Sequence, residues 1–356
     1  MRVALVTFNI SGGLNHYVSC LANELSKICE LRVFTPTKFD MGWIDKVDIH
    51  EMPIPCSKID FAKMAFHPNQ FLEMFDEIKE FDPDIIHINE RNLGFFPILA
   101  LLDKKKVVLT IHDPVPHSGS GSWYSGIETK AFLQKAPNII VHGEKFRCYY
   151  PDRQVFVLPH GEYGRFKFDG DVKEEEDTVL FFGRINKYKG IDVLIKAMRE
   201  VMSLRPQTRL IIAGKGDFKE IGIDIESGNG IEIINDYIPN DDVAKLFQRS
   251  SIVVLPYIDG SQSGVLATSM ALGKATIATR VGCFEEILED RKNGLLVPPG
   301  EIGELRDAIL ELLENKDLRN ELGRNAKEYS DEFLQWDSIA RKTLKAYGTI
   351  LGGASE

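Results

Sequence analysis

The feature that most constrains this chain is an alternation of short apolar runs with helical stretches. In the first half, strand-like runs rich in β-branched residues are Arg2–Phe8, Leu31–Thr35, Asp84–Ile88, Val107–Ile111, Asn138–Val141 and Val155–Leu158. Helical spacing of apolar residues is found between most of them, notably in Tyr17–Ile28, Phe71–Phe81 and Gly94–Asp103. This pattern predicts a parallel sheet with helices on both faces, because parallel strands need crossover connections.

The alternation begins again after residue 177. The second set of strand-like runs is Thr178–Phe182, Arg209–Ala213, Ile231–Ile234, Ile252–Leu255, Thr276–Thr279 and Gly294–Val297. The helical stretches that accompany it are Ile191–Ser203, Asp241–Ser250, Leu266–Leu272, Glu285–Glu289 and Glu301–Glu314. We therefore predict two Rossmann-like α/β domains, residues 1–165 and 166–335, joined through the polar segment Glu162–Asp177. Ligands of such sheets bind beyond the carboxyl ends of the strands.

The chain ends in a further amphipathic stretch, Asp331–Tyr347, whose apolar side includes Trp336 and Tyr347. The pattern alone is compatible with a helix that covers the second domain and with one that returns to the first.

Composition excludes several classes of protein. The net charge of −10 argues against a nucleic-acid binder, which needs clustered Lys and Arg for phosphate contacts. The five cysteines are scattered without Cys-x-x-Cys spacing, which indicates a reduced chain with neither a disulfide framework nor a zinc site. No apolar run reaches the roughly 20 residues of a membrane helix. We expect a soluble, cytoplasmic protein.

The turns after the strands do not suit a dinucleotide. Ser11-Gly12-Gly13 lacks the GxGxxG spacing, and Gly214-Lys215-Gly216 holds only half of it. The chain also contains no GxxxxGK[ST] phosphate loop. Binding of NAD and P-loop chemistry are therefore both poor explanations.

Three turns do suit an anion. Gly12-Gly13 lies where a strand leads into a helix, so bare N–H groups can face a negative group. Arg184 follows a strand and Lys189 comes five residues later, so both cations can converge on one diphosphate. The third turn, YIDGSQSGV from Tyr257, is small and polar and opens a helix. Tight turns and solvated surface charges are the alternative explanations.

At these residues the sequence resembles glycosyltransferase family 4, the group 1 retaining transferases. The motifs that carry the resemblance are SGGLNHYV at residue 11, TIHDPVPHSG at 110, FFGRINKYKGIDVLIKAM at 181, IIAGKGD at 211 and VVLPYIDGSQSGV at 253. The resemblance implies the GT-B architecture of two facing Rossmann-like domains. The N-terminal domain would bind the acceptor and the C-terminal domain a nucleotide-sugar, and the last helix, residues 336–356, would cross back to the N-terminal domain.

The resemblance also implies roles for individual residues. It makes His112, Arg184 and Lys189 the catalytic-site residues, with Arg184 and Lys189 on the donor diphosphate. Further donor-binding positions are Gly12, Gly13, Gly183, Gln262, Ser263, Gly264 and Val265. Nucleoside-binding positions are Gly214, Tyr237, Ile238 and Thr268. Histidines expected on the acceptor side are His16, His117, His142 and His160, although a buried structural imidazole is the alternative for His160.

The chain departs from the family at one point. Many members carry two glutamates eight positions apart across the third turn and its helix. Here the corresponding positions fall near Gly260 or Ser261 and near Thr268 or Ser269, and Asp259 is the nearest acid. The carboxylate usually placed on the ribose is therefore missing, and a hydroxyl such as that of Thr268 is expected to replace it.

The function that the resemblance implies is a retaining hexosyltransferase. Its substrates would be a nucleoside-diphosphate sugar and a glycan or lipid-linked acceptor, in cell-surface polysaccharide or glycoconjugate synthesis. We expect no cofactor and no metal. A lipid-linked acceptor would bring the protein to the inner face of the membrane as a peripheral protein, a contact that the aromatic stretch Phe61–Phe81 leaves open. The alternatives are a sugar-nucleotide epimerase or phosphorylase of the same architecture, and a non-catalytic nucleotide- or glycan-binding protein.

Overall fold

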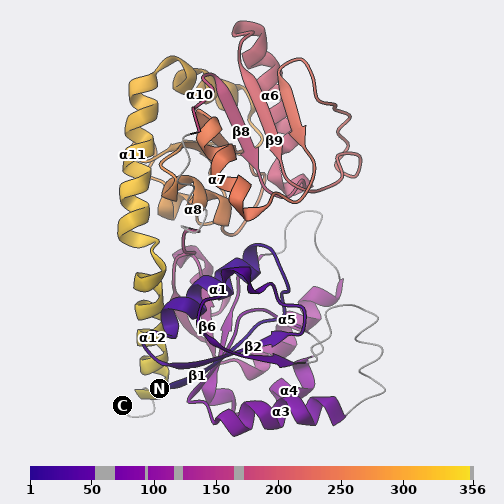
Figure 1. Ribbon diagram of the computed structural model, residues 1–356, viewed down its shortest axis with the longest axis vertical. Coiled ribbons are helices and arrows are strands. Elements are labelled where there is room, and N and C mark those ends of the chain that lie inside the picture. Colours follow the sequence, from indigo (N-terminus) through magenta and orange to yellow (C-terminus); the bar gives the residue numbers. More distant parts are fainter. Residues whose placement is uncertain (53–68, 93–94, 116–122, 164–171, 353–356) are drawn as a thin grey trace. The chain divides into compact units, whose positions relative to one another are not determined.

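The structure, a computed structural model, describes residues 1–52, 69–92, 95–115, 123–163 and 172–352 (Figure 1). The chain forms two compact units. The first contains residues 1–114, 121–161 and 336–356, and the second contains residues 115–120 and 162–335. The predicted boundary after residue 165 lies outside the described residues.

The first unit is built on a parallel sheet, in which the described residues form seven strands in the order β3-β2-β1-β4-β5-β6-β7. These strands are β1 (Arg2–Val6), β2 (Glu30–Pro36), β3 (Asp48–Met52), β4 (Ile85–Ile88), β5 (Val107–Thr110), β6 (Asn138–Val141) and β7 (Gln154–Val157). The six strands predicted from apolar runs are confirmed. The edge strand β3 was missed because its sequence, DIHEM, is largely polar and only its last residue, Met52, is buried.

Helices connect these strands. In the described part of the unit they are α1 (Gly13–Leu25), η1 (Met41–Trp43), α3 (Asn69–Phe81), α4 (Phe96–Leu101), η3 (Lys104–Lys106), α5 (Trp123–Lys135), η4 (Glu144–Tyr149) and α12 (Trp336–Gly352). Helix α12 packs on α1, which confirms that the last helix returns to the first unit (Figure 1). Gly161 makes room for it, because a Cβ there would lie 2.4 Å from Cε2 of Trp336.

The second unit repeats the plan with strands in the order β10-β9-β8-β11-β12-β13, six of them among the described residues. They are β8 (Thr178–Phe182), β9 (Arg209–Ala213), β10 (Ile231–Ile234), β11 (Ile252–Leu255), β12 (Ala275–Thr279) and β13 (Leu295–Val297). All of them pair in parallel. Each of the predicted strands is confirmed, because short runs of Val, Ile and Leu buried on both faces are typical of a parallel sheet.

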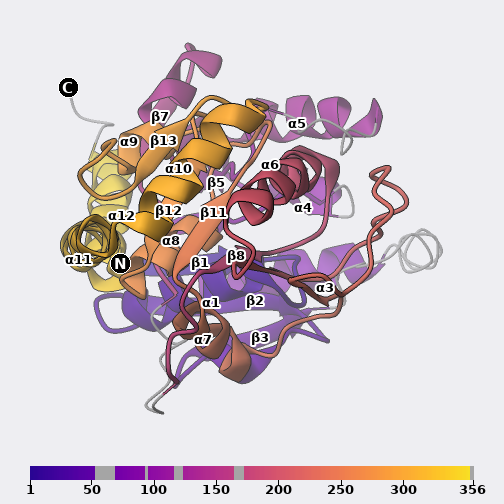
Figure 2. The same ribbon diagram turned by 90° about the horizontal axis from the view of Figure 1, so that it is seen from above.

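The helices described in this unit are η6 (Lys187–Lys189), α6 (Ile191–Leu204), α7 (Asn240–Arg249), α8 (Gly264–Ala271), α9 (Phe284–Ile287), α10 (Ile302–Glu314) and α11 (Lys316–Phe333). Helices α6 and α10 pack side by side (Figure 2). The single helix expected over Asp331–Tyr347 is wrong. The first residues of that stretch belong to α11, which ends before the buried Leu334, and α12 starts at Trp336.

The acidic segment predicted as a linker is partly anchored. The guanidinium of Arg249 donates to the carboxylate of Glu175 over 2.9 Å, and the ammonium of Lys274 lies 3.5 Å from the carboxylate of Glu174. Residues 172–177 therefore pack on the second unit.

In both units the strand order reverses beside the first strand, between β1 and β4 and between β8 and β11. In open parallel sheets a ligand crevice forms at this switch point, outside the carboxyl ends of the strands. Among the described residues, no helix is both long and apolar enough to span a bilayer.

Candidate functional site

The switch point of the second unit carries the predicted diphosphate residues. Strand β8 ends at Phe182 and leads directly into Gly183 and Arg184, while β11 ends at Leu255 and leads into Pro256 and Tyr257. The two strands are neighbours in the sheet. Residues distant in sequence therefore meet at one edge, where a ligand of this fold is expected.

Two glycines follow strands at this edge of the sheet. Gly183 and Gly214 have φ values of +122° and +146°, which side-chain-bearing residues rarely adopt. A Cβ on Gly214 would lie 2.0 Å from the carbonyl oxygen of Gly183, so the two backbones approach too closely for any other residue. A Cβ on Gly183 would lie 3.9 Å from Nζ of Lys189. The glycines thus keep bare backbone beside a cationic group.

Lys189 contacts an aromatic side chain. The residue is 8% exposed, its ammonium donates to the hydroxyl of Tyr257, and its Nζ lies 3.8 Å from the centroid of the Tyr257 ring. Burial raises the pKa of Tyr257, so the phenol stays neutral. A buried ammonium over a ring combines a hydrogen bond with a cation–π contact. Arg184, by contrast, is exposed.

The predicted donor loop leads into helix α8. The Ser263 hydroxyl accepts from the backbone N–H of Leu266 over 3.2 Å and caps the helix, and the first turn contains no acid. Oγ of Ser261 and Oε1 of Gln262 are buried and have no hydrogen-bond partner among the described residues. A helix N-terminus without carboxylates, next to polar atoms that lack partners, suits an anionic ligand with hydroxyl groups.

The residues predicted to bind the nucleoside occupy two different environments. Gly214 follows β9, and Tyr237 and Ile238 follow the neighbouring strand β10, so the three lie at the same edge of the sheet. Tyr237 is 51% exposed, whereas Ile238 is buried. Thr268 is 2% exposed and its hydroxyl donates to the carbonyl of Gly264 over 2.8 Å. The proton of that hydroxyl is therefore already engaged within α8.

In the first unit, Gly12 and Gly13 open helix α1. Gly12 has φ of +81°, and a Cβ there would meet no atom within 4 Å, so this turn is open. His16, one turn further on, stacks on Trp43 with the ring centroids 4.1 Å apart. Burial lowers the pKa of His16 to about 4, so its imidazole is neutral at pH 7.

Three predicted histidines gather at the carboxyl ends of adjacent strands. His112, His142 and His160 follow β5, β6 and β7, and all three are buried. Nε2 of His142 lies 2.9 Å from Nδ1 of His112. Tyr17 of α1 packs against all three rings, at centroid distances between 4.7 and 5.4 Å. The structure thus joins into one cluster residues that are spread over 48 positions of the sequence.

The sequence of each unit matches a known family. The profile described as Glycosyltransferase Family 4 matches residues 11–161, and the profile described as Glycosyl transferases group 1 matches residues 164–329. Together the two matches cover most of the chain. The chain belongs to the family 4, group 1 glycosyltransferases.

Curated relatives support this assignment. The chain is 26% identical to a phosphatidyl-myo-inositol mannosyltransferase of Mycolicibacterium smegmatis, over 99% of this chain and 95% of the relative. It is 35% identical to an uncharacterized glycosyltransferase of Methanocaldococcus jannaschii over 47% of each chain. We conclude that the protein is a glycosyltransferase of the hexosyltransferase type.

Solved structures show the same fold. A sucrose-phosphate synthase from Thermosynechococcus elongatus aligns with a TM-score of 0.75 and 21% identity, covering 99% of this chain and 100% of that one. Anabaena Alr3699/HepE in complex with UDP aligns with a TM-score of 0.74 and 14% identity, covering 98% and 100%. The GT-B fold class predicted from the sequence is therefore confirmed.

The structure of this glycosyltransferase adds candidate residues that the sequence did not single out. His87 and Asn89, on and after β4, are fully buried beside the histidine cluster. The ring of His87 bridges the hydroxyls of Tyr347 and Thr110, each over 2.6 Å. The side-chain amide of Asn89 donates to Glu90 over 2.9 Å. The signal was present in the sequence, because His87, Asn89 and Glu90 interrupt or follow an apolar strand at its carboxyl end.

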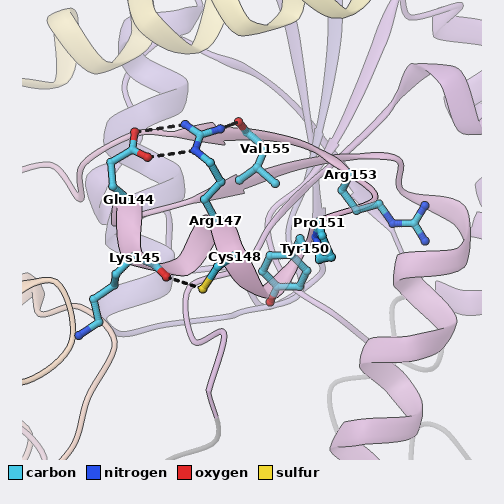
Figure 3. A pocket seen from close by; sticks show the side chains of 8 residues that line it. All are labelled: Glu144, Lys145, Arg147, Cys148, Tyr150, Pro151, Arg153 and Val155. Atoms are coloured by element: carbon cyan, nitrogen blue, oxygen red, sulfur yellow. Dashed lines mark hydrogen bonds and ion pairs between the residues drawn. The ribbon is translucent and has the colours of Figure 1, made fainter.

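A separate depression lies on the first unit of the glycosyltransferase, with a volume of about 580 Å³. It is lined by residues of η4 and β7, and Figure 3 shows Arg147 forked onto Glu144 and donating to the carbonyl of Val155. The thiol of Cys148 donates to the carbonyl of Lys145 over 3.2 Å. None of the predicted site residues lines this depression.

Two further predictions concern histidine and metal. His117 lies outside the described residues. Among the residues that are described, no three His, Cys, Asp or Glu side chains are grouped so that they could hold a metal ion.

Proposed function

We propose that this glycosyltransferase moves a hexosyl group from a nucleoside-diphosphate sugar to a hydroxyl of a glycan or lipid-linked acceptor, with retention of anomeric configuration. The observation that carries the proposal is the switch point of the second unit. There the Lys189 ammonium lies beside the bare backbone of Gly183, and the acid-free start of α8 belongs to the same unit. Such a site suits a pyrophosphate group and the sugar that it carries.

The named relatives support the choice of substrates. The Anabaena protein has been solved with UDP, with UDP and glucose, and with UDP-glucose. The mycobacterial relatives are phosphatidyl-myo-inositol mannosyltransferases. A nucleoside-diphosphate sugar is therefore the donor class we propose here. A lipid-linked acceptor would place the protein at the inner face of a membrane as a peripheral protein.

The reaction requires stabilisation of the negative charge on the leaving diphosphate. The bond between the anomeric carbon and the diphosphate oxygen breaks, and negative charge develops on the leaving diphosphate. Arg184 and Lys189 would stabilise that charge, the guanidinium through two hydrogen bonds and the ammonium as a point charge. Retention without a protein nucleophile is explained if the acceptor hydroxyl attacks on the face that the diphosphate leaves and passes its proton to the phosphate oxygen. We propose that these two cations make a metal ion unnecessary.

The test is a panel of nucleoside-diphosphate sugars, each incubated with the protein with and without candidate glycan and lipid acceptors. A transferase releases nucleoside diphosphate chiefly when an acceptor is present. An epimerase would instead change the sugar without an acceptor, and a binding protein would be stabilised against heat by the nucleotide yet release none. Anomeric configuration of the product is read by NMR, and a parallel reaction with a chelator tests the metal requirement.

A further inference from the structure

Hydrogen bonding determines which nitrogen of His142 carries its proton. Nδ1 of His142 lies 2.9 Å from the carbonyl oxygen of Leu158, and a carbonyl can only accept. Nδ1 is therefore protonated. Burial lowers the pKa of His142 to about 4, so the ring is neutral and its Nε2 has a lone pair. The only role left for Nε2 in this pair is that of acceptor.

The same reasoning extends to His112. Because Nε2 of His142 accepts, Nδ1 of His112, which lies 2.9 Å away, must donate to it. Burial also lowers the pKa of His112 well below its ordinary value, so this ring is neutral too. His112 therefore carries its proton on Nδ1, and its Nε2 keeps a lone pair.

The lone pair of His112 faces no donor among the residues that the structure describes. The contact given for Nε2 is Oδ1 of Asn89, 3.4 Å away. The amide nitrogen of Asn89 donates to the carboxylate of Glu90 over 2.9 Å, which leaves Oδ1 as an acceptor as well. Glu90 is in turn held by the backbone N–H of Phe8 over 2.9 Å. Two acceptors thus face each other, and a third group that donates would satisfy both.

We propose that His142 is a positioning residue, which holds His112 in the Nδ1–H tautomer so that Nε2 accepts a hydrogen bond from a hydroxyl group of a bound sugar. This rests on the proposed function, because a glycosyltransferase has sugar substrates whose hydroxyl groups His112 could bind. Asn89 also favours a hydroxyl group at this position, because its side-chain oxygen repels any ligand group that can only accept a hydrogen bond.

Loss of His142 has a defined consequence under this proposal. Without an acceptor for Nδ1–H, His112 gains by moving its proton to Nε2, where Asn89 Oδ1 can accept it. His112 and Asn89 then form a hydrogen bond with each other. Nε2 of His112 has no lone pair left to accept a hydrogen bond from the sugar hydroxyl.

The experiment uses the full chain labelled with ¹⁵N-histidine. Two-bond ¹H–¹⁵N spectra report which ring nitrogen is protonated, and the eight histidines of the chain are assigned through single variants. We expect Nδ1–H at His142 and His112 in the wild type at pH 7. His112 should keep this tautomer in His142→Gln, whose side-chain oxygen can still accept, and change to Nε2–H in His142→Leu. Nε2–H at His112 in the wild type would overturn the proposal without any need for a variant.

Activity provides the second readout. Transfer by His142→Leu should fall by about tenfold or more, since a buried donor loses its partner, and His142→Gln should recover part of the loss. His50→Leu is the matched control, because His50 is a half-exposed histidine of β3 in the same unit, and it should change neither readout. Equal losses in the two His142 variants, with the tautomer of His112 unchanged, would also contradict the proposal.

Binding of uridine or guanosine diphosphate separates this proposal from the proposed function. The diphosphate residues belong to the second unit, so His142→Leu should bind as the wild type does. A wild type that binds neither diphosphate and transfers no sugar would refute the proposed function, while the tautomer result would stand independently.

Discussion

Tyr257→Phe removes the oxygen that holds Lys189 and leaves the ring in place. In the wild type, the Tyr257 hydroxyl accepts from the Lys189 ammonium and lies 3.2 Å from the hydroxyl of Ser263. The ring centroid lies 3.8 Å from Nζ of Lys189, so the cation–π contact survives the substitution. Only the hydrogen bonds are lost. If Lys189 acts on the diphosphate, its altered position should lower turnover.

The magnitude follows from the kind of bond. A hydrogen bond from a charged donor contributes about 1.5–3 kcal/mol, which corresponds to a loss of about 10- to 100-fold in kcat/KM if all of it is expressed in the transition state. Removal of the ammonium itself, in Lys189→Met, should cost about 10²- to 10³-fold, as for the loss of one charge-stabilising group. The second loss includes the first, because Tyr257 acts through Lys189.

The assay is a double-mutant cycle on acceptor-dependent release of nucleoside diphosphate. Tyr257→Phe combined with Lys189→Met should be no slower than Lys189→Met alone, so the two effects are not additive. Tyr329→Phe is the matched control, because Tyr329 is a tyrosine of the same unit whose hydroxyl donates to the carbonyl of Glu286, and it should retain full activity. Additive losses would show that Tyr257 does not act through Lys189, and unchanged kcat/KM in Lys189→Met would refute the diphosphate assignment.

Two further predictions concern stability. Gly190→Ala should lower the free energy of unfolding by about 3 kcal/mol or more, since its φ is +65° and a Cβ would lie 1.9 Å from the carbonyl oxygen of Pro256. The control is Gly222→Ala, which measures the cost of the backbone conformation alone, because Gly222 has φ of +74° and a Cβ there would meet no atom within 4 Å. The free energy of unfolding is measured by urea titration, and an equal loss in the two variants would contradict the steric argument. Acid should also destabilise the fold, because burial lowers the pKa of His142 to about 4 and of His87 and His160 to about 3. The neutral rings stabilise the folded state fully above pH 6.5, and each should lose about 2 kcal/mol by pH 5, where the unfolded chain binds more protons. The loss between pH 7.5 and 5 should be smaller in His142→Gln, and an unchanged loss would show that His142 does not contribute.

Much of the fold could be read from local sequence. The parallel strands at the centre of each sheet are short runs of Val, Ile and Leu, and such runs are typical of strands that are buried on both faces. The turns at Gly12 and Gly183 could also be recognised from local sequence, because a backbone with positive φ favours glycine. The edge strand β3 was missed because an edge strand need not be apolar.

The candidate site was only half visible. Arg184 and Lys189 stand out because they lie five positions apart within one strand–turn–helix segment. The contact between Lys189 and Tyr257 spans 68 positions and depends on β8 and β11 being neighbours in the sheet.

The sequence by itself determined the alternation of strands and helices, the positions of the bare turns and the cations beside them, because each of these depends on residues a few positions apart. Only the tertiary structure decided which strand ends are adjacent. It is the order β4-β5-β6 that places Asn89, His112 and His142 in one row, in which His112 and His142 are hydrogen-bonded. The direction of the protons along that row follows from the carbonyl of Leu158, a backbone group that no side-chain pattern reports.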